Sequence, residues 1–355
     1  MVENPPLVLP QTFMRSFATW WHDPANEIET HVQTILFGAP ARALLETQIE
    51  AGAGAFVGIV RTPWETDRLY APYDAEPRDV PAVWISAANG DRLLALLRGG
   101  RARGRLRAAS SVAEATSHNV TGVLRGPSDD WVIVGSHHDG PWASAVEDAS
   151  GVALVLAQAR YWAGIPEIER PHNLLFLLNA GHMAGGAGLR RFTTVNEAFI
   201  RERVVLELHL EHVAREARVE DARLVPTDAP EWRWWFTSFI PPLEEIVADA
   251  ICREDLGRSL LMPPQGFPPG NARPPTDAAR FHPLSPIVSL LSAPMYLFDP
   301  ADTVEMVHEE SLVPLTRAAV RIVDATGDHT AAGLRARVYE RPRPAPLPPC
   351  EEPES

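Results

Sequence analysis

Three apolar runs of the chain each end in side chains that can bind a metal ion. The runs are 131–135, 173–179 and 204–210, and the residues concerned are His137, His138, Asp139, His182, Glu211 and His212. Because the carboxyl ends of parallel strands meet at one edge of a sheet, we expect these side chains to lie close together. Imidazole and carboxylate groups that converge from several strands are the donors that a divalent cation requires.

Two further carboxylates, Glu147 and Asp148, stand just before a helix expected over 150–164. Taken singly, a histidine is most often a hydrogen-bonded core or surface residue, and Asp148 has an alternative role as a helix cap. Taken together, the set favours a metal site. His138 is not expected to be a ligand, because strand alternation turns its ring away from the side that His137 faces.

The elements that position these residues alternate between strands and helices. A further strand is predicted over 287–292, and the alternation indicates an α/β fold whose mostly parallel sheet is covered by helices on both faces. Nearer the N-terminus, apolar runs at 52–60 and 80–86 and a helix at 93–97 predict a small α/β domain. Two long segments, 225–242 and 263–275, are interpreted as loops that form pocket walls; the tryptophans of the first, Trp232, Trp234 and Trp235, suit a satellite core equally well.

The composition excludes several classes of function. The 355 residues include 46 Asp and Glu against 32 basic residues, with a formal net charge of -14 and no lysine. Without lysine the chain has neither a Walker phosphate loop nor a Schiff-base catalyst. The negative charge would repel a phosphate backbone, so we expect no nucleic-acid partner.

The ends of the chain and its two cysteines suggest where the protein works. Cys252 and Cys350 are far apart in the sequence, so no disulfide is expected, which fits a reducing compartment. Neither a signal peptide nor an apolar stretch of about 20 residues is present, so we expect a cytoplasmic protein that does not associate with membranes. The Pro-rich segment 331–355 is predicted to be disordered.

The segment 135–160, GSHHDGPWASAVEDASGVALVLAQAR, resembles the signature of metallopeptidase family 28, whose members include dinuclear zinc aminopeptidases. The resemblance continues through GGAG at 185–188, a strand that ends in HLEH, and TDAARF followed by DPADT, and covers roughly residues 119–323. The upstream runs GAGAFVGIV, VPAVWIS and NGDRLLALL resemble the protease-associated domain that many members carry. Two resemblances in the family's usual order imply the zinc-aminopeptidase fold.

The resemblance also implies roles for four residues. His137 matches the first metal-ligating histidine. Asp139 matches an aspartate two residues further on, and strand alternation places it on the same side as His137. Glu147 stands where the family has the aspartate that bridges two metals. Glu211 stands where it has the aspartate that completes the first metal's shell.

The second metal of the family has lost two of its ligands. Met183 replaces a glutamate ligand and Phe298 replaces the final histidine, and neither side chain is a good donor for zinc. The resemblance therefore implies that one metal survives, held by His137, Glu147 and Glu211, with a coordination position left for water. Zinc is the preferred ion, and iron and manganese stay open.

His182 occupies the position of the family's general base. A neutral imidazole there would take a proton from metal-bound water, because its ordinary pKa of about 6.5 suits that task near neutral pH. Two alternatives stay open: His182 is a further metal ligand, or it is a remnant without a role.

These observations combine into one hypothesis. Residues 1–40 would pack on the body, 41–115 would form the protease-associated-like domain, and 116–330 would form the catalytic domain, acting as a metal-dependent hydrolase on a peptide, amide or related small substrate. His182 and Asp139 are the candidate catalytic residues, and His137, Glu147, Glu211 and His182 are the candidate metal ligands. The alternatives are a silent binding or scaffold protein and a mononuclear enzyme with different chemistry.

Overall fold

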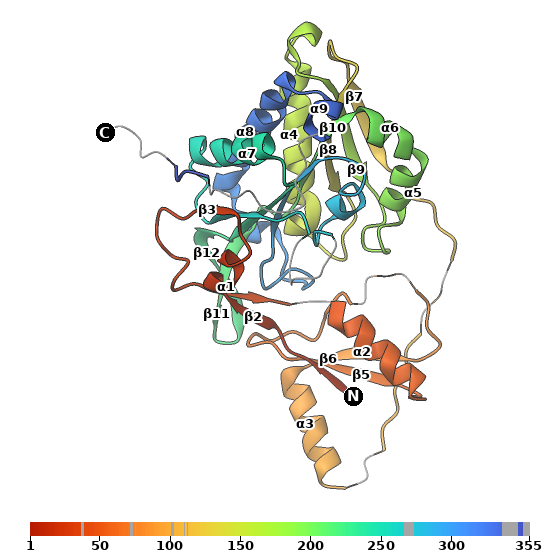
Figure 1. The fold of residues 1–355 in the computed structure, drawn as a ribbon. Helices are drawn as coiled ribbons and strands as arrows, with labels where there is room; N and C mark the ends of the chain where they lie inside the picture. Colours follow the sequence, from red (N-terminus) through yellow and green to blue (C-terminus); the bar gives the residue numbers. More distant parts are fainter. Residues whose placement is uncertain are drawn as a thin grey trace.

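A computed structural model describes residues 1–36, 39–71, 74, 76–100, 103–109, 111, 113–265, 273–335 and 347–350. The chain forms a small unit near the N-terminus and a larger body (Figure 1). The small unit is a three-stranded sheet with two helices, and its elements are β1 (Val2–Asn4), β5 (Phe56–Val60), β6 (Ala82–Ser86), α2 (Ala39–Glu50) and α3 (Ala87–Arg98). Its strands are parallel, in the order β1-β5-β6.

The body is built on an eight-stranded mixed sheet, in the order β3-β14-β13-β15-β10-β8-β9-β7. The strands are β3 (Trp20–His22), β7 (Val120–Leu124), β8 (Trp131–His137), β9 (Asn173–Asn179), β10 (Val204–Leu210), β13 (Arg233–Thr237), β14 (Ser259–Met262) and β15 (Ile287–Ser292). The central neighbours β15, β10, β8 and β9 run parallel. Their carboxyl ends therefore meet at one edge, as the sequence predicted.

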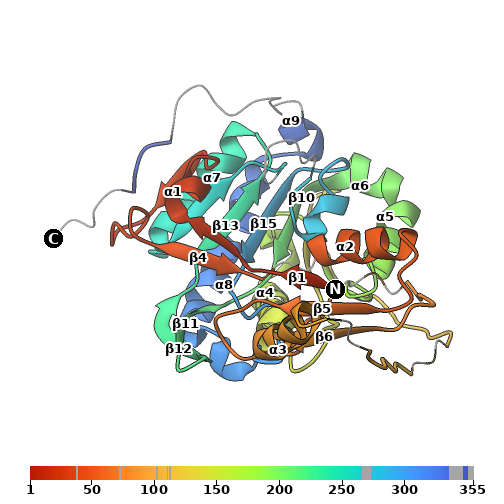
Figure 2. The same ribbon diagram turned by 90° about the horizontal axis from the view of Figure 1, so that it is seen from below.

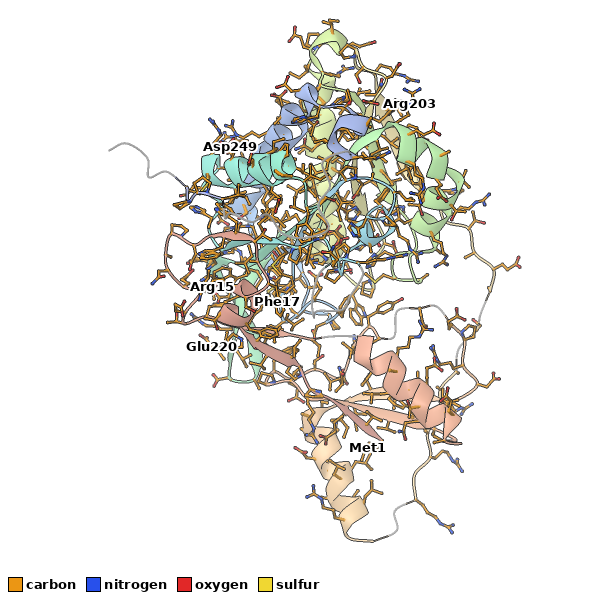
Figure 3. The ribbon with its side chains drawn as sticks, in the orientation of Figure 1. Met1, Arg15, Phe17, Arg203, Glu220 and Asp249 are labelled. Atoms are coloured by element: carbon orange, nitrogen blue, oxygen red, sulfur yellow. A yellow bond between two sulfur atoms is a disulfide. The ribbon has the colours of Figure 1, made fainter. Side chains whose placement is uncertain are left out.

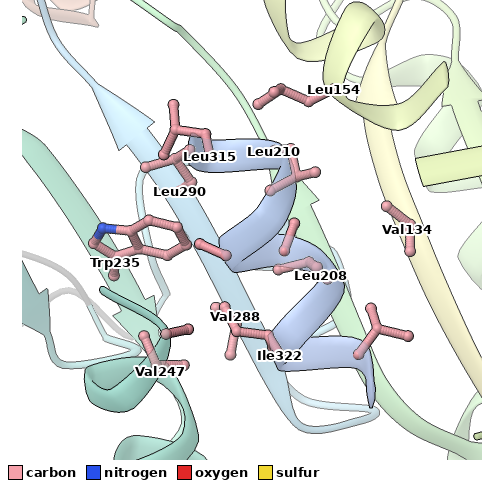
Figure 4. Packing of buried hydrophobic residues seen from close by; sticks show 14 of the residues in the cluster. Val134, Leu154, Leu208, Leu210, Trp235, Val247, Val288, Leu290, Leu315 and Ile322 are labelled. Atoms are coloured by element: carbon pink, nitrogen blue, oxygen red, sulfur yellow. The ribbon is translucent and has the colours of Figure 1, made fainter. Parts of the chain in front are cut away.

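Helices cover both faces of this sheet. The helices of the body are α4 (Gly151–Ala163), α5 (Ala187–Val195), α6 (Glu197–Arg203), α7 (Pro241–Arg253), α8 (Glu309–Ala325) and α9 (Ala331–Arg335). On one face, Leu154 of α4, Val247 of α7 and Ile322 of α8 pack against sheet residues such as Leu208 and Val288 (Figure 4). On the other face, α5 and α6 pack against the opposite sides of β8, β9 and β10. The predicted α/β class is confirmed.

The N-terminal segment contributes to both units. Strand β1 joins the small sheet, whereas β3 pairs with β14 at the edge of the large one. The segment also contains α1 (Gln11–Arg15) and the antiparallel pair β2 (Leu7–Pro10) and β4 (Val32–Ile35). A hairpin of the body pairs β11 (Arg215–Glu220) with β12 (Arg223–Pro230) (Figure 2). The first forty residues therefore do not pack on the body alone.

The segment 225–242 is not a pocket-lining loop. Its centre is strand β13, which pairs with β14 and β15 inside the large sheet. Trp232, Trp234 and Trp235 are buried and belong to the core. The other segment expected to line a pocket, 263–275, lies partly outside the described residues, because the description stops at 265 and resumes at 273.

The expectation about the cysteines is wrong. Cys252 on α7 and Cys350 form a disulfide across a sequence separation of 98 residues. Leu347 is buried in the main core, and the indole nitrogen of Trp20 donates a hydrogen bond to the backbone oxygen of Pro348. The described parts of 331–355, helix α9 and residues 347–350, are thus packed, unlike the expected disordered tail, and the pairing removes the argument for a reducing compartment.

Charged side chains are exposed on several helices and strands of the body. Arg203, Glu220 and Asp249 are exposed and project from α6, β11 and α7 (Figure 3). Among the described residues, no helix combines the length and the apolar character needed to cross a membrane. Several ionisable groups are nevertheless buried, and those at the edge of the large sheet lie close together.

We expect the disulfide to stabilise the fold. Replacing Cys350 with Ser should lower the free energy of unfolding by about 2–4 kcal/mol, because the cross-link restricts the unfolded chain. Urea unfolding of the variant and of the wild type, with and without reductant, measures this. Reductant should lower the stability of the wild type to that of the variant and leave the variant unchanged; two titratable thiols in the air-oxidised wild type would contradict the pairing.

Candidate metal centre

The carboxylate of Glu147 lies at the centre of a group of imidazoles. Glu147 belongs to the turn between β8 and α4 and is 2% exposed. Its Oε1 lies 3.3 Å from Nε2 of His137 and 3.6 Å from Nε2 of His182, and its Oε2 lies 2.6 Å from Nε2 of His212. His137 is the last residue of β8, and the other three residues lie in the connections that follow β8, β9 and β10. The parallel strands therefore bring these donors to one point.

Two of the three rings are oriented by backbone carbonyl groups. Nδ1 of His137 lies 2.9 Å from the backbone oxygen of Asp139, and Nδ1 of His212 lies 2.6 Å from that of Ser292. In the neutral ring this places the proton on Nδ1 and leaves the Nε2 lone pair directed towards Glu147. Metal-bound histidines show the same arrangement.

Three buried atoms of this group face one another without a hydrogen bond of adequate geometry. They are Nε2 of His137, Oε2 of Glu147 and Nε2 of His212. One donor atom from each of the three residues lies within 4.8 Å of the other two. Two imidazole nitrogens and one carboxylate oxygen fit zinc, iron or manganese, so the residues present suit a divalent cation.

Other carboxylates of the region hold the backbone that carries these donors. The two oxygens of Asp302 accept the N–H groups of Val146 at 2.7 Å and of Glu147 at 2.9 Å. Asp148 accepts hydrogen bonds from Ser136 Oγ and from the N–H groups of Gly151, at 3.1 Å, and His212, at 3.2 Å. Gly151 begins α4, so Asp148 also has the capping role considered for it.

Asp139 positions the loop that carries His182. Its carboxylate accepts the N–H groups of His182 at 3.1 Å and of Met183 at 2.9 Å. The ring of His182 stacks on that of His137, with 3.9 Å between the centroids and 7° between the planes. Its Nδ1 lies 3.0 Å from Oδ1 of Asp277. Asp139 therefore acts on the site through the backbone.

Glu211 lies in a neighbouring group of donors. Its Oε1 is 3.0 Å from Nε2 of His209, and these two residues form a second set with Asp277. Of the four ligands expected from the sequence, His137, Glu147 and His182 contact one another, whereas Glu211 contacts His209. His138 points elsewhere, with Nε2 2.9 Å from the backbone oxygen of His118.

Met183 and Phe298 both contact the segment 64–70, which belongs to the connection between β5 and β6 of the small unit. Phe298 packs against the cluster that contains Trp64 and Leu69. The hydroxyl of Tyr70 donates to the backbone oxygen of Met183 at 3.2 Å, and its N–H donates to that of Phe298 at 3.1 Å. The positions expected to lack donors therefore anchor the segment 64–70 beside the candidate metal centre.

Sequence reasoning did not assign roles to four of the buried residues: His212, His209, Glu207 and Asp277. The run 204–210 contains the missing signal, because Glu207, His209 and Glu211 alternate with leucines. In a strand this alternation places the three polar side chains on one face. Asp277 belongs to the motif TDAARF, but only its contact with His182 identifies its role.

The histidines around Glu147 are strongly basic in the metal-free protein. Burial by itself lowers the pKa of His182 and of His212, but Asp277 acting on His182, and Glu147 acting on both rings, outweigh this effect. The pKa of each ring is raised to about 10. Burial raises the pKa of Glu147, and the contacts with His212 and His137 more than reverse this, so the pKa lies well below its usual range.

The stability of metal-free protein should therefore fall at alkaline pH. A histidine whose pKa is higher in the folded state stabilises the fold fully below its unfolded value of about 6.5, and this stabilisation is lost as the pH rises towards 10. Urea unfolding in the presence of a chelator between pH 7 and 10 measures this loss of stability. Because the chain has no lysine, no lysine titrates in this pH range. His182→Gln should show a shallower fall than the control His138→Gln; stability that stays level in the wild type would contradict the prediction.

The larger unit resembles known peptidases. A model described as "Peptidase family M28" matches residues 119–259. Among solved structures, a zinc aminopeptidase from Bacillus subtilis has a TM-score of 0.56 at 15% identity, over 83% of this chain and 69% of that one. An aminopeptidase from Aneurinibacillus sp. strain AM-1 has a TM-score of 0.51 at 22% identity, over 79% of this chain.

These comparisons have clear bounds. The chain spans 64% of the Aneurinibacillus enzyme's length, and no curated protein sequence matches it. The M28 match lies within the larger unit, so the resemblance of the small unit to a protease-associated domain stays a prediction. Residues 119–259 thus match the model of peptidase family M28, and the fold is that of the zinc aminopeptidases.

Proposed function

We propose that this protein is a metal-dependent hydrolase of peptide or related amide bonds, with one divalent cation bound by His137, Glu147 and His212. The observation that carries the proposal is the set of three buried donor atoms without hydrogen bonds. Backbone carbonyl groups orient both rings of this set, as expected for metal-bound histidines. The match to an M28 peptidase model and the zinc-aminopeptidase fold support the same reaction class.

A cation held by His137, Glu147 and His212 would supply Lewis-acid chemistry, namely polarisation of the substrate carbonyl and activation of water. Zinc is the preferred ion, because two imidazoles and one carboxylate with an open position are typical of catalytic zinc sites. Iron and manganese accept related donor sets. Glu211, the ligand expected from the sequence, is not needed for this set of three.

His182 is the proposed general base. Its ring has a pKa of about 10 without a metal ion, and a cation bound by Glu147 would lower that pKa by repelling the imidazolium, so that the neutral ring can accept a proton. Oδ1 of Asp277 lies 3.0 Å from Nδ1 of His182 and holds the ring. The side-chain amide of Asn179 donates a hydrogen bond of 2.7 Å to Oδ2 of Asp277. In this arrangement Nε2 faces Glu147 and is the atom that accepts and delivers the proton. A carboxylate behind a histidine fixes its orientation and stabilises the imidazolium that forms.

The position of His182 also suits contact with a substrate. The side chain of His182 is 16% exposed, whereas those of His137, Glu147 and His212 are at most 4% exposed. His182 is thus the member of the group that meets solvent. We infer that substrate approaches on this side, where Trp142 is exposed and packs against Tyr70.

Metal content tests the site. Protein stripped with chelator and re-equilibrated with Zn²⁺ should retain an ion that is lost in His212→Asn and in Glu147→Gln, because each change removes a donor. Elemental analysis after gel filtration measures the bound zinc per chain. The control His138→Asn should bind as much zinc as the wild type; wild-type zinc in His212→Asn would exclude this residue from the site.

Kinetics test the base. With the zinc protein and a panel of amino-acid p-nitroanilides, His182→Gln should lower kcat by about 10²–10⁴-fold, the usual contribution of a general base. KM and bound zinc should change little, because the three proposed ligands remain. A zinc-loaded wild type that cleaves no amide substrate would instead favour the binding-protein alternative.

A further inference from the structure

A second group of buried metal donors lies beside the first and shares no residue with it. It consists of His209, Glu211 and Asp277, and one donor atom from each lies within 4.8 Å of the other two. His209 belongs to β10, Glu211 follows that strand directly, and Asp277 begins the short 3-10 helix Asp277–Arg280. The family resemblance does not assign His209 or Asp277 as a metal ligand.

His209 is held in the orientation of a metal ligand. Oε1 of Glu207 lies 2.8 Å from its Nδ1, so the proton of the neutral ring is fixed on that side. Its Nε2 lies 3.0 Å from Oε1 of Glu211 but makes no hydrogen bond of adequate geometry. A carboxylate that binds one nitrogen of a histidine while the other faces a second ligand is the usual surrounding of a metal-bound imidazole.

The packing leaves this ring little freedom. Gly135 of β8 is paired with His209, and a Cβ atom at Gly135 would lie 3.1 Å from Nδ1 of His209 and 3.4 Å from Oε1 of Glu207. A glycine in the neighbouring strand therefore makes the room that the imidazole and its carboxylate occupy. His209 and Glu207 are both fully buried.

The charges of the group are unbalanced. Three carboxylates, those of Glu207, Glu211 and Asp277, surround the imidazole of His209. A second ring, that of His182, contacts Asp277 but is shared with Glu147. Oε2 of Glu207 and Oδ1 of Asn179 are buried without a hydrogen bond. Excess negative charge away from water is costly unless a cation compensates it.

We propose that His209, Glu211 and Asp277 bind a second divalent cation, and that Glu207 orients His209 for this purpose. One imidazole nitrogen and two carboxylate oxygens suit zinc or manganese. The site does not depend on the hydrolase proposal, because its ligands are distinct from His137, Glu147 and His212. Asp277 links the two sites, because it also contacts His182.

Counting bound ions tests the proposal. The full chain is stripped with chelator, equilibrated with excess Zn²⁺, passed over a desalting column and analysed for zinc per chain. The wild type should hold two ions, His209→Asn one, His212→Asn one, and the double variant none. Circular dichroism and melting of each metal-free variant check that it folds.

Each outcome bears on one site or the other. A wild type with a single ion, lost in His212→Asn and kept in His209→Asn, overturns this inference and leaves the hydrolase proposal standing. A single ion with the reverse pattern supports the second site and overturns the first, and a wild type without zinc overturns both. If His209→Asn does not fold, Asp277→Asn replaces it, because it keeps the shape of the side chain; it must lose one ion.

Discussion

The burial of the Glu147 carboxylate is the constraint on which the rest of the centre depends. A carboxylate that is 2% exposed must be compensated by positive charge, by hydrogen bonds or by a metal ion. Here three imidazoles, from the carboxyl end of β8 and the connections after β9 and β10, approach its two oxygens. The parallel order of these strands is what allows three distant parts of the sequence to reach one carboxylate.

A second set of carboxylates makes that convergence possible by holding the backbone. Asp302, Asp148 and Asp139 each accept backbone N–H groups of the loops that carry the donors. Their oxygens are occupied in this way, and the loops are fixed because polar backbone groups in a buried region need partners. Some carboxylates of the centre therefore hold the backbone, and others face imidazole rings.

Particular elements show how far sequence reasoning reaches. The strands that carry His137 and Glu211 were predictable, because runs of apolar residues bounded by polar ones indicate buried strands. Strand β13 was missed, because Pro and Trp residues around it suggested a loop, whereas its pairing with β14 and β15 decides the matter. The Cys252–Cys350 disulfide was missed because 98 residues separate its partners and no local pattern relates them.

The sequence by itself determined the α/β class and the edge of the sheet at which the ionisable residues meet. These follow from local periodicity and residue type. Only the tertiary structure decided that His212 faces Glu147, that Glu211 faces His209 and that Asp277 holds His182. The physical reason is that a carboxylate or an imidazole has the same local signature whether its partner is a backbone amide, another side chain or a metal ion, and the partner is set by contacts between residues far apart in the chain.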